Sequence, residues 1–313
     1  MIGRPTAVPL TAVIVTYQSA RTIAACLTAA RRCRDEGLMD VVVVDNGSDD
    51  GTPAMLEREA GWAQVMLTGV NNGFARGCNI GLRRAATPYT VFINPDAEVE
   101  PAAIRTMLEF MDRHPGAGIA GPAIVEGAPG GPTELQDTGE RPTARSIARN
   151  ALPFARRSSL SWDIVPGSAP ARTGWVCGAV LMIRTELAKR LNGFDPRFFL
   201  YWEEMDLCKR AEDAGHEIWA LGTAVVHHIG GASSVRDDTR IGGCVAQYYF
   251  PSRYYYMVKH HGRPAAVCAE LVEFALTAAR ALFDLVRGRG LGRLRPRLQA
   301  RLLSEPDRVA DER

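Results

Sequence analysis

Short apolar runs alternate with stretches of helical periodicity in the first part of the chain. Four runs rich in β-branched and aromatic residues have the length of strands: LTAVIVT at 10–16, VVVVD at 41–45, a run at 64–68 and YTVFIN at 89–94. Between them, apolar residues recur at helical spacing near 20–32, 76–86 and 101–113, and a shorter helix follows the second run. This alternation predicts an α/β fold with a mostly parallel sheet and helices on both of its faces.

The pattern changes near residue 126. Residues 126–172 are rich in Gly, Pro, Ser and Arg, which predicts a mobile or variable insertion. The elements expected after it are a strand at WVCGAVLMI (175–183), a helix beginning near Trp202, and strands near Ile218 and Val225. We therefore expect one α/β domain over residues 1–237, which contains the insertion, and a helical C-terminal region over 238–313.

Composition describes an ordinary globular protein. The chain has 313 residues, of which 46% are hydrophobic and 23% charged, and a net charge of +2 gives no reason to expect a nucleic-acid partner. The seven cysteines occur singly and without zinc-site spacing, which indicates free thiols in a reducing compartment. We find no signal peptide and no apolar run of the ~20 residues that span a bilayer. We therefore expect a cytoplasmic protein, or one on the cytoplasmic face of a membrane.

Polar residues follow three of the predicted strands. They are Thr16 and Tyr17 after the first, Asp45 and Asn46 after the second, and Asn94 and Asp96 after the fourth. Ligands of an open parallel sheet bind beyond the carboxyl ends of its strands, so we expect these side chains to lie together. The amides and carboxylates suit a nucleoside diphosphate, and Asp96 is the hard oxygen ligand that a bridging Mg²⁺ or Mn²⁺ requires. Each cluster alone would also suit a turn or a helix cap.

A second candidate for nucleotide contact is the segment NNGFARGCN at 71–79. It places Asn72, Arg76 and Asn79 around the expected start of a helix, where main-chain N–H groups can bind a phosphate. A glycine-rich turn followed by a helix cap explains the same spacing. The chain has no Walker loop and no G-x-G-x-x-G, which argues against P-loop NTPases and nicotinamide enzymes.

The helix expected near Trp202 carries acidic residues on both of its faces. One face holds Glu203, Asp206, Arg210 and Asp213, and we expect this face to be solvated and salt-bridged. Glu204 falls on the apolar face, with Leu207, Cys208 and Ala211. Partial burial would raise the pKa of Glu204 whereas the helix N-terminus would lower it, and this environment suits a general base. The alternative is a buried glutamate paired with an arginine.

Two adjacent histidines, His227 and His228, end the last predicted strand. Neighbouring residues of a strand point to opposite faces, so at most one of them can reach a given site. That histidine could complete a metal site begun by Asp96 or contact a diphosphate. A structural histidine is the alternative.

Taken together, these segments resemble the family 2 glycosyltransferases. The similar segments are VIVTYQS (13–19), VVVVDNGSDDGT (41–52), NNGFARGCNIG (71–81), FINPDAEV (92–99), GAVLMIRTELAKRLNGFDPRFFLYWEEMDLCKRAEDAG (178–215) and VVHHIGGASS (225–234). They follow the family's order from about residue 8 to residue 261. The resemblance implies a GT-A fold and inversion of the anomeric centre, and it is greatest to bacterial rhamnosyltransferases that act on polyprenyl-diphosphate-linked sugars.

The resemblance also implies roles for individual residues. Thr16, Asp45 and Asn46 would contact the nucleoside, and Asp96 matches the metal-binding aspartate of the family's D-x-D element, whose first acid is replaced by Asn94. Glu204 matches the catalytic acid of the family's Glu-Asp pair, and His228 aligns better than His227 with a histidine near the diphosphate. The acceptor would meet Trp175, Gly178 and Ala179, with Glu203 beside them.

The same resemblance implies the reaction. Mg²⁺ or Mn²⁺ would stabilise the leaving nucleoside diphosphate while Glu204 deprotonates the acceptor hydroxyl, in one displacement. It favours dTDP-L-rhamnose as donor and a lipid-linked or glycan acceptor of cell-envelope polysaccharide synthesis, with UDP-galactofuranose as an alternative donor. A sugar-1-phosphate nucleotidyltransferase is the competing class, but TYQSART at 16–22 lacks the glycine-rich loop of such enzymes.

The C-terminal region combines an apolar stripe with a basic tail. Leu271, Phe274, Ala275, Ala278, Leu282 and Leu285 recur at helical spacing within residues 264–286. Arginines follow at 287, 289, 293, 295, 297 and 301 with no acid among them. These features predict attachment to an anionic membrane surface, on the inner face of the plasma membrane. The alternatives are a helix packed on the catalytic domain and a homodimer interface.

Overall fold

The structure is a computed structural model. It describes residues 8–127, 133–150, 161–229 and 243–288, together with 294, 297, 298, 300 and 303–306.

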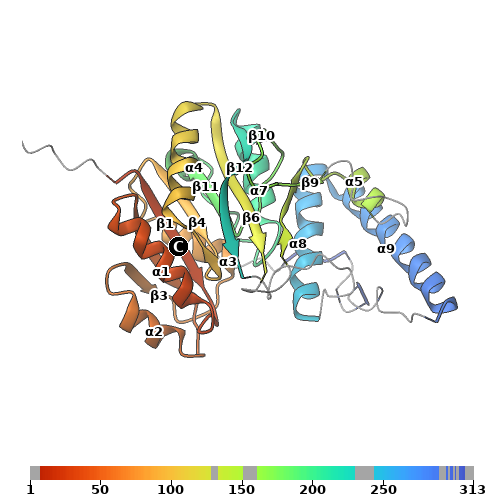
Figure 1. The fold of residues 1–313 in the computed structure, drawn as a ribbon. Helices are drawn as coiled ribbons and strands as arrows, with labels where there is room; N and C mark the ends of the chain where they lie inside the picture. Colours follow the sequence, from red (N-terminus) through yellow and green to blue (C-terminus); the bar gives the residue numbers. More distant parts are fainter. Residues whose placement is uncertain are drawn as a thin grey trace, which may run out of the picture.

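A ten-stranded sheet forms the centre of the molecule (Figure 1). Its main path runs β10 (Ala171–Arg172), β12 (Glu217–His228), β6 (Ala117–Glu126), β11 (Val180–Arg184), β4 (Tyr89–Ile93), β1 (Leu10–Thr16), β2 (Met39–Asp45) and β3 (Gln64–Leu67). Strand β5 (Ala97–Glu98) pairs with β12, and β7 (Glu134–Leu135) pairs with β6. The β4-β1-β2-β3 half is parallel, as is the β6–β12 pair, whereas β11 runs antiparallel to both of its neighbours.

Helices cover both faces of this sheet. Helices α1 (Ile23–Asp35), α2 (Thr52–Glu59) and α4 (Pro101–Arg113) pack on one face, and α3 (Phe74–Leu82), α6 (Thr185–Arg190) and α7 (Glu203–Asp213) pack on the other. Successive side chains of a strand alternate between faces, so in β1 Ile14 joins the first core and Val13 and Val15 the second. The predicted α/β architecture with its mostly parallel sheet is confirmed.

The helical C-terminal region is also confirmed. It contains α8 (Gly243–His261) and α9 (Arg263–Val286), and α9 extends away from the sheet on the side opposite α1 and α2 (Figure 1). The start of this region, residues 238–242, lies outside the described residues.

One central strand, β6, was not predicted from the sequence. Gly118, Gly121 and Pro122 interrupt its apolar pattern, and such residues are depleted in strands. The structure explains the two glycines by close packing, because an added Cβ would lie 2.6 Å from His216 at Gly118 and 2.6 Å from Val176 at Gly121. The strands expected near Ile218 and Val225 are one strand, β12, with an irregularity between Leu221 and Val225.

The segment 126–172 is more ordered than its composition predicted. Besides β7 and β10, it contains β8 (Asp137–Gly139), α5 (Ala144–Asn150) and β9 (Ser161–Asp163), and β8 and β9 form a small second sheet. The described parts of this segment therefore contain regular secondary structure that its composition did not indicate. Pairing of β7 with β6 and of β10 with β12 supplies the order that a Gly- and Pro-rich composition does not reveal.

Helix α8 packs along residues 198–202, which lead into α7. Its aromatic side chains pack on those of this segment, for example in the pairs Phe198–Tyr255, Phe199–Tyr248 and Trp202–Tyr256, with ring centroids 4.9, 4.6 and 5.3 Å apart. Ser252 also donates a hydrogen bond of 3.0 Å to the Leu200 carbonyl. The C-terminal region is thus part of the packing around α7.

The buried carboxylate of Asp206 joins α7 to α8. Its oxygens lie 2.7 Å from Arg210 Nε, 2.7 Å from Lys259 Nζ and 2.7 Å from His260 Nε2, and its side chain is 0% exposed. Burial alone would raise its pKa, but the hydrogen bond with His260 and the charges of Arg210 and Lys259 outweigh burial and lower the pKa to about 2. The sequence predicts that Asp206 lies on a solvated face and pairs with Arg210. The ion pair with Arg210 is present, but α8 covers this face of α7, so Asp206 is buried.

A second buried ion cluster holds the end of the chain. Arg253 of α8 makes a two-point ion pair with Glu270 of α9 at 2.9 and 3.0 Å. Arg297 pairs with the same Glu270, and both arginines contact Glu273, at 3.1 and 2.9 Å. Arg297 is 1% exposed, so it cannot reach a membrane surface as part of the basic tail that the sequence predicts. Arginines 289, 293, 295 and 301 lie outside the described residues.

We expect Asp206→Asn to destabilise the fold. The change leaves two cations buried against a neutral amide, which costs about 3 kcal/mol of unfolding free energy at pH 7. Because the folded pKa of Asp206, about 2, lies below its ordinary value of 3.8, its stabilisation is present above pH ~4 and is lost as the pH falls toward 2. Urea unfolding at several pH values would therefore show wild type and variant converging at acid pH.

Asp213→Asn is the matched control. Asp213 lies about two helical turns after Asp206 and pairs with Lys209 at 2.6 Å. Its side chain is 49% exposed, so its loss should cost less than ~1 kcal/mol. Equal destabilisation by both substitutions would contradict the role given to Asp206.

Candidate active site

The ends of β1 and β2 place two buried oxygens side by side. Thr16 and Asp45 are register partners at the carboxyl ends of the two strands. Ser48 N donates to one carboxylate oxygen of Asp45 at 3.0 Å. The other oxygen of Asp45 and the Thr16 hydroxyl are buried without a hydrogen-bond partner in the described structure. Unsatisfied buried oxygens at this edge are suited to bind hydroxyl and N–H groups of a ligand.

Two amides assigned to the nucleotide are used inside the protein instead. The Asn46 side chain donates to Asn71 Oδ1 at 3.0 Å and to the Gly73 carbonyl at 3.1 Å, and accepts from Asn72 N at 3.1 Å. The Asn79 side chain bonds both main-chain groups of Phe194, at 2.7 and 2.8 Å. Both amides therefore hold loops at this edge of the sheet, and their assignment to the nucleotide stays a prediction.

Other predicted nucleotide residues remain accessible at the same edge. Tyr17 is exposed, and Asn72 is half-buried with its amide donating to the Val70 carbonyl at 3.2 Å. Arg76 lies in the first turn of α3, and its Nε is buried without a hydrogen-bond partner among the described residues.

Pairing of β5 with β12 brings Asp96 to His228. His228 lies opposite Ala97 in this pair, and its Nε2 is 2.9 Å from Asp96 Oδ1. His228 is buried whereas His227 is exposed, as their alternation along a strand requires. Burial alone would lower the pKa of His228, but its interactions with Asp96 and Glu126 raise it to about 9. Of the two candidate histidines, only His228 faces Asp96.

The pair could hold a divalent ion only together with other ligands. Among the described residues there is no group of three or more His, Cys, Asp or Glu side chains with metal-site geometry. Asp96 and His228 supply one carboxylate oxygen and one imidazole nitrogen, a donor set compatible with Mn²⁺ and, through the carboxylate, with Mg²⁺. The remaining positions would fall to diphosphate oxygens and water, so the residues fit a metal that binds with its nucleotide.

Glu203 and Glu204 begin α7, and the structure corrects the predicted face of Glu203. Glu203 is 4% exposed rather than solvated, because the side of α7 on which it lies is covered. Burial, reinforced by the charge of Glu204, raises the pKa of Glu203 well above its ordinary value. Burial also raises the pKa of Glu204, to about 7, and main-chain hydrogen bonds at the start of α7 offset only part of this effect.

The alternative to a catalytic role is a glutamate that pairs with an arginine. Among the described residues, no arginine forms an ion pair with Glu203 or Glu204. One carboxylate oxygen of Glu203 and one of Glu204 are buried without a hydrogen-bond partner in the described structure. The turn before them is strained, since Tyr201 and Trp202 both have left-handed backbones, with φ of 68° and 72°. Packing of Trp202 against Tyr256 of α8 holds this turn in place.

Two contacts join the strand ends to α7. Asn94 N donates to the Ala179 carbonyl at 2.8 Å, which ties the segment before β11 to the end of β4. The neighbouring Gly178 packs on Glu204, whose Cβ would lie 3.5 Å from a Cβ added at Gly178. Asp96, the Gly178–Ala179 segment and Glu204 therefore belong to one continuous region. Trp175 lies at the start of the same segment, half-buried, in a bridge with Gly139.

Sequence reasoning missed several residues of this region. Glu126, at the end of β6, lies 3.5 Å from His228 Nδ1 and had no signal because β6 itself was not predicted. Lys259 and His260 hold Asp206 from α8, 53 or more positions away in the sequence; no local motif identifies them.

Comparison with known proteins agrees with this arrangement. A mostly parallel sheet with polar groups at its strand ends and a helical C-terminal region is the GT-A architecture of nucleotide-sugar-dependent transferases. The chain matches the model of the family described as "Glycosyl transferase family 2" over residues 11–173, just over half of its length. It belongs to glycosyltransferase family 2.

Two curated relatives are similar over much of the chain. The N-acetylglucosaminyl-diphospho-decaprenol L-rhamnosyltransferase of Mycobacterium tuberculosis is 28% identical over 215 residues, which cover 61% of this chain and 66% of the relative. The low-salt glycan biosynthesis hexosyltransferase Agl10 of Haloferax volcanii is 26% identical over 207 residues, covering 64% and 61%. The chain thus spans less than two thirds of the length of either relative.

Solved structures share the fold at low sequence identity. GalNAc-T7 with UDP, GalNAc and Mn²⁺ superposes with a TM-score of 0.56 at 14% identity, over 91% of this chain and 58% of the other. The mannosyltransferase PcManGT from Pyrobaculum calidifontis, in complex with GDP-Man and Mn²⁺, gives 0.53 at 17% identity, over 94% and 85%. These likenesses show the fold.

We expect Asn79→Ala to lower stability without weakening nucleotide binding. The substitution leaves both main-chain groups of Phe194 without their partner, which costs roughly 1–3 kcal/mol. Calorimetric titration with dTDP, well below the melting temperature, should give a Kd within about twofold of wild type. A Kd raised tenfold with an unchanged Tm would restore Asn79 to the nucleotide site.

Proposed function

We propose that this chain is an inverting hexosyltransferase that transfers L-rhamnose from dTDP-L-rhamnose to a polyprenyl-diphosphate-linked sugar in cell-envelope polysaccharide synthesis. The observation that carries the proposal is Glu204, a half-buried residue packed on Gly178, whose pKa is raised to about 7 by desolvation and whose Oε2 is buried without a hydrogen-bond partner among the described residues. Such a group can accept a proton at neutral pH, as a general base must.

The donor and acceptor are argued from the relatives. The mycobacterial relative is named for rhamnosyl transfer to a decaprenol-linked N-acetylglucosamine. The haloarchaeal relative is named a hexosyltransferase, which supports the wider class. Structural neighbours contain UDP or GDP-Man with Mn²⁺ on the same fold. UDP-galactofuranose is the alternative donor, and a screen of nucleotide sugars decides between them.

In the proposed mechanism, Asp96 and His228 would hold Mg²⁺ or Mn²⁺, which would neutralise charge on the departing diphosphate. Thr16 and Asp45 would bind the nucleoside through their free oxygens, and Arg76 would contribute a positive charge near the phosphates. Glu204 removes the proton from the acceptor hydroxyl, whose oxygen attacks the anomeric carbon from the face opposite the leaving group. Trp175 and the Gly178–Ala179 segment would position the acceptor beside Glu204.

Glu203 has a different role from Glu204 in the proposed mechanism. Burial and the charge of Glu204 raise its pKa and so favour its neutral form, and we therefore assign the base to Glu204 rather than to Glu203. A neutral acid can donate a hydrogen bond, and we propose that Glu203 supports the orientation of Glu204 and the acceptor. This replaces the solvated role expected from the helical projection.

The function is tested first by turnover. With wild-type protein, Mn²⁺ and a short-chain lipid analogue of the acceptor, dTDP-L-rhamnose should yield dTDP and a rhamnosylated product detected by mass spectrometry. Transfer from UDP-galactofuranose and not from dTDP-L-rhamnose would replace the proposed donor with the alternative one. The absence of transfer from any nucleotide sugar to any sugar diphosphate lipid would contradict the proposed function.

Glu204→Gln should lower kcat roughly 10²–10⁴-fold while the Kd for dTDP stays within about twofold. Glu203→Gln mimics a protonated acid and should cost no more than about tenfold. In wild type and Glu203→Gln, the rate should rise with pH up to about 7 and then level, because Glu204 becomes a base only above its pKa. An equal loss in both variants, or an acid limb that survives in Glu204→Gln, would remove Glu204 from this role.

Nucleotide binding should depend on a divalent ion. We expect calorimetry to give a Kd for dTDP at least about tenfold lower with Mn²⁺ than with EDTA, since Asp96 and His228 would hold an ion that offsets the charge of the diphosphate. Asp96→Asn and His228→Ala should abolish the difference, whereas the exposed His227→Ala should retain it. Equal affinity with Mn²⁺ and EDTA in wild type would contradict the metal site.

A further inference from the structure

Helix α9 turns its charged face toward the protein. Glu270 is buried, Glu273 is largely buried, and both are neutralised by Arg253 and Arg297. Ala266, Ala269 and Ala281, also buried, complete the inward side. The usual amphipathic helix of a globular protein places its apolar side inward; here the arrangement is reversed.

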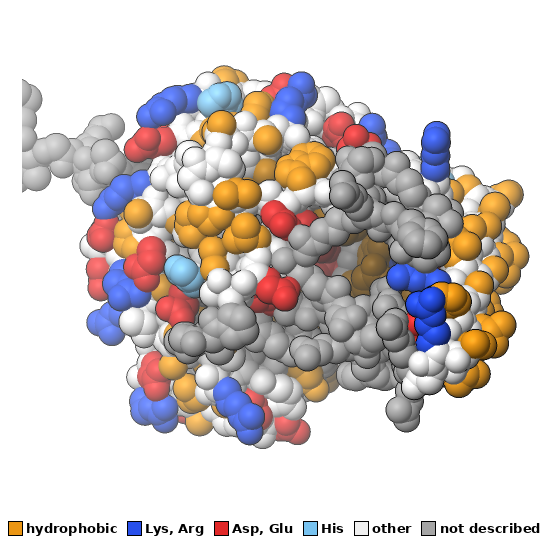
Figure 2. Space-filling view, turned by 45° about the vertical axis from the view of Figure 1, so that its right-hand side comes forward, with side chains coloured by type: hydrophobic (Ala, Val, Ile, Leu, Met, Phe, Trp, Pro, Cys, Tyr) orange, Lys and Arg blue, Asp and Glu red, His pale blue; other side chains and the backbone are white. Residues whose placement is uncertain are grey.

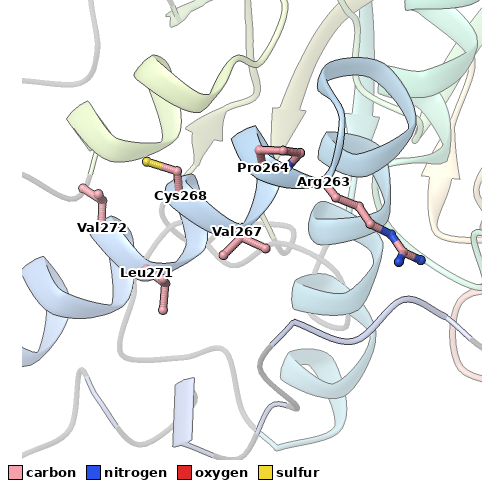
Figure 3. A pocket seen from close by; sticks show the side chains of 6 residues that line it. All are labelled: Arg263, Pro264, Val267, Cys268, Leu271 and Val272. Atoms are coloured by element: carbon pink, nitrogen blue, oxygen red, sulfur yellow. The ribbon is translucent and has the colours of Figure 1, made fainter.

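The outward face of α9 is apolar. Its exposed large side chains are Leu271, Val272, Leu282, Phe283, Leu285 and Val286. Figure 2 shows hydrophobic side chains gathered along the right-hand side, where α9 lies in Figure 1. In the first turns of the helix, Pro264, Val267 and Leu271 line a shallow apolar groove with Cys268 and Val272 (Figure 3). A contiguous apolar surface of this kind marks a site of interaction.

The charges on this surface have one sign. The exposed charged residues at the two ends of α9 are Arg263, which pairs with Glu305 at 3.2 Å, and Arg287, whereas Asp284, Glu273 and Glu270 are half-buried or buried on the opposite side of the helix. An apolar face flanked by arginines, with no acid on it in the described structure, complements acyl chains bordered by anionic headgroups.

We propose that the outward face of α9 lies in the surface of a lipid bilayer, with Leu282, Phe283 and Val286 inserted among the acyl chains. In the described part of the chain no helix is long and apolar enough to cross a membrane. A helix with one apolar face instead lies parallel to the bilayer surface. Of the two features that the sequence predicted for membrane attachment, the apolar stripe carries this proposal, because Arg297 of the basic tail is buried.

This surface is rigidly connected to the candidate active site. Helix α9 begins directly after α8, whose Lys259 and His260 bind Asp206 on the same helix as Glu204. His261 adds a hydrogen bond of 3.0 Å to the Pro142 carbonyl. The benefit of this placement rests on the proposed function: a lipid-linked acceptor would present its sugar beside the membrane to which the enzyme is attached.

The experiment is vesicle sedimentation without donor or acceptor. Wild type should sediment with vesicles of phosphatidylcholine alone, more strongly when phosphatidylglycerol is added, and should remain bound to a large extent at high salt. Leu282→Gln/Phe283→Gln should weaken partitioning on the order of tenfold or more. The matched control is Leu67→Gln/Val165→Gln, since Leu67 and Val165 are 63% and 52% exposed elsewhere, against 61% and 55% for Leu282 and Phe283. This control should bind as wild type does.

Several results would overturn the proposal. They are wild type that stays in the supernatant with both vesicles, equal binding by the two double variants, and binding to anionic vesicles that high salt abolishes. A wild-type dimer that Leu282→Gln/Phe283→Gln dissociates, without vesicle binding, would assign this face to a second copy of the chain. Because no nucleotide sugar is used, failure here leaves the transferase proposal standing. If the enzyme proves not to transfer a sugar, vesicle binding can still be observed.

Discussion

The buried carboxylate of Asp206 is the constraint on which the arrangement around α7 depends. It is the one acid in the first turn of α7 that is held by basic side chains, which are Arg210 of α7 itself and Lys259 and His260 of α8. Their attraction fixes α8 against α7, so that the aromatic side chains of α8 cover the strained turn at Tyr201 and Trp202. Covering this turn withdraws Glu203 from water.

One turn of helix thus creates opposite electrostatic environments. Asp206 remains ionised far below neutral pH, whereas Glu203 and Glu204, which have no cationic partner among the described residues, have raised pKa values. Neighbouring acids whose environments separate their pKa values are characteristic of acid–base chemistry. The same α8 carries Arg253, which neutralises the acids of α9 and allows that helix to expose its apolar side. The chemistry and the surface property of the molecule therefore share one structural support.

Much of the fold could be predicted because local pattern and tertiary structure agree. The β1, β2 and β4 runs are buried on both faces and read as strands, and α4 begins at Pro101 as its sequence indicates. Strand β6 could not be predicted, because its glycines serve contacts with His216 and Val176 that lie far away in the sequence. The order in residues 126–172 likewise comes from pairing with distant strands.

For the site, the sequence predicted positions better than roles. Because ligands bind beyond the carboxyl ends of parallel strands, Thr16, Asp45 and Asp96 were expected at one edge of the sheet. Because side chains alternate along a strand, only one of the two histidines could face Asp96. The sequence did not reveal that the side chains of Asn46 and Asn79 form hydrogen bonds within the protein, since an amide suits a ligand and a loop equally. The helical projection grouped Glu203 with Asp206 on one face correctly, but nothing in it showed that α8 would cover that face.

The central claim is that Glu204 activates an acceptor hydroxyl for a single displacement at the anomeric carbon. The most direct test is the anomeric configuration of the product, measured by proton NMR on the sugar transferred by wild-type enzyme. The account predicts a glycoside whose configuration is opposite to that of the nucleotide-sugar donor. A product that retains the donor's configuration would contradict it, because retention requires a different chemical path from the one that a lone general base provides.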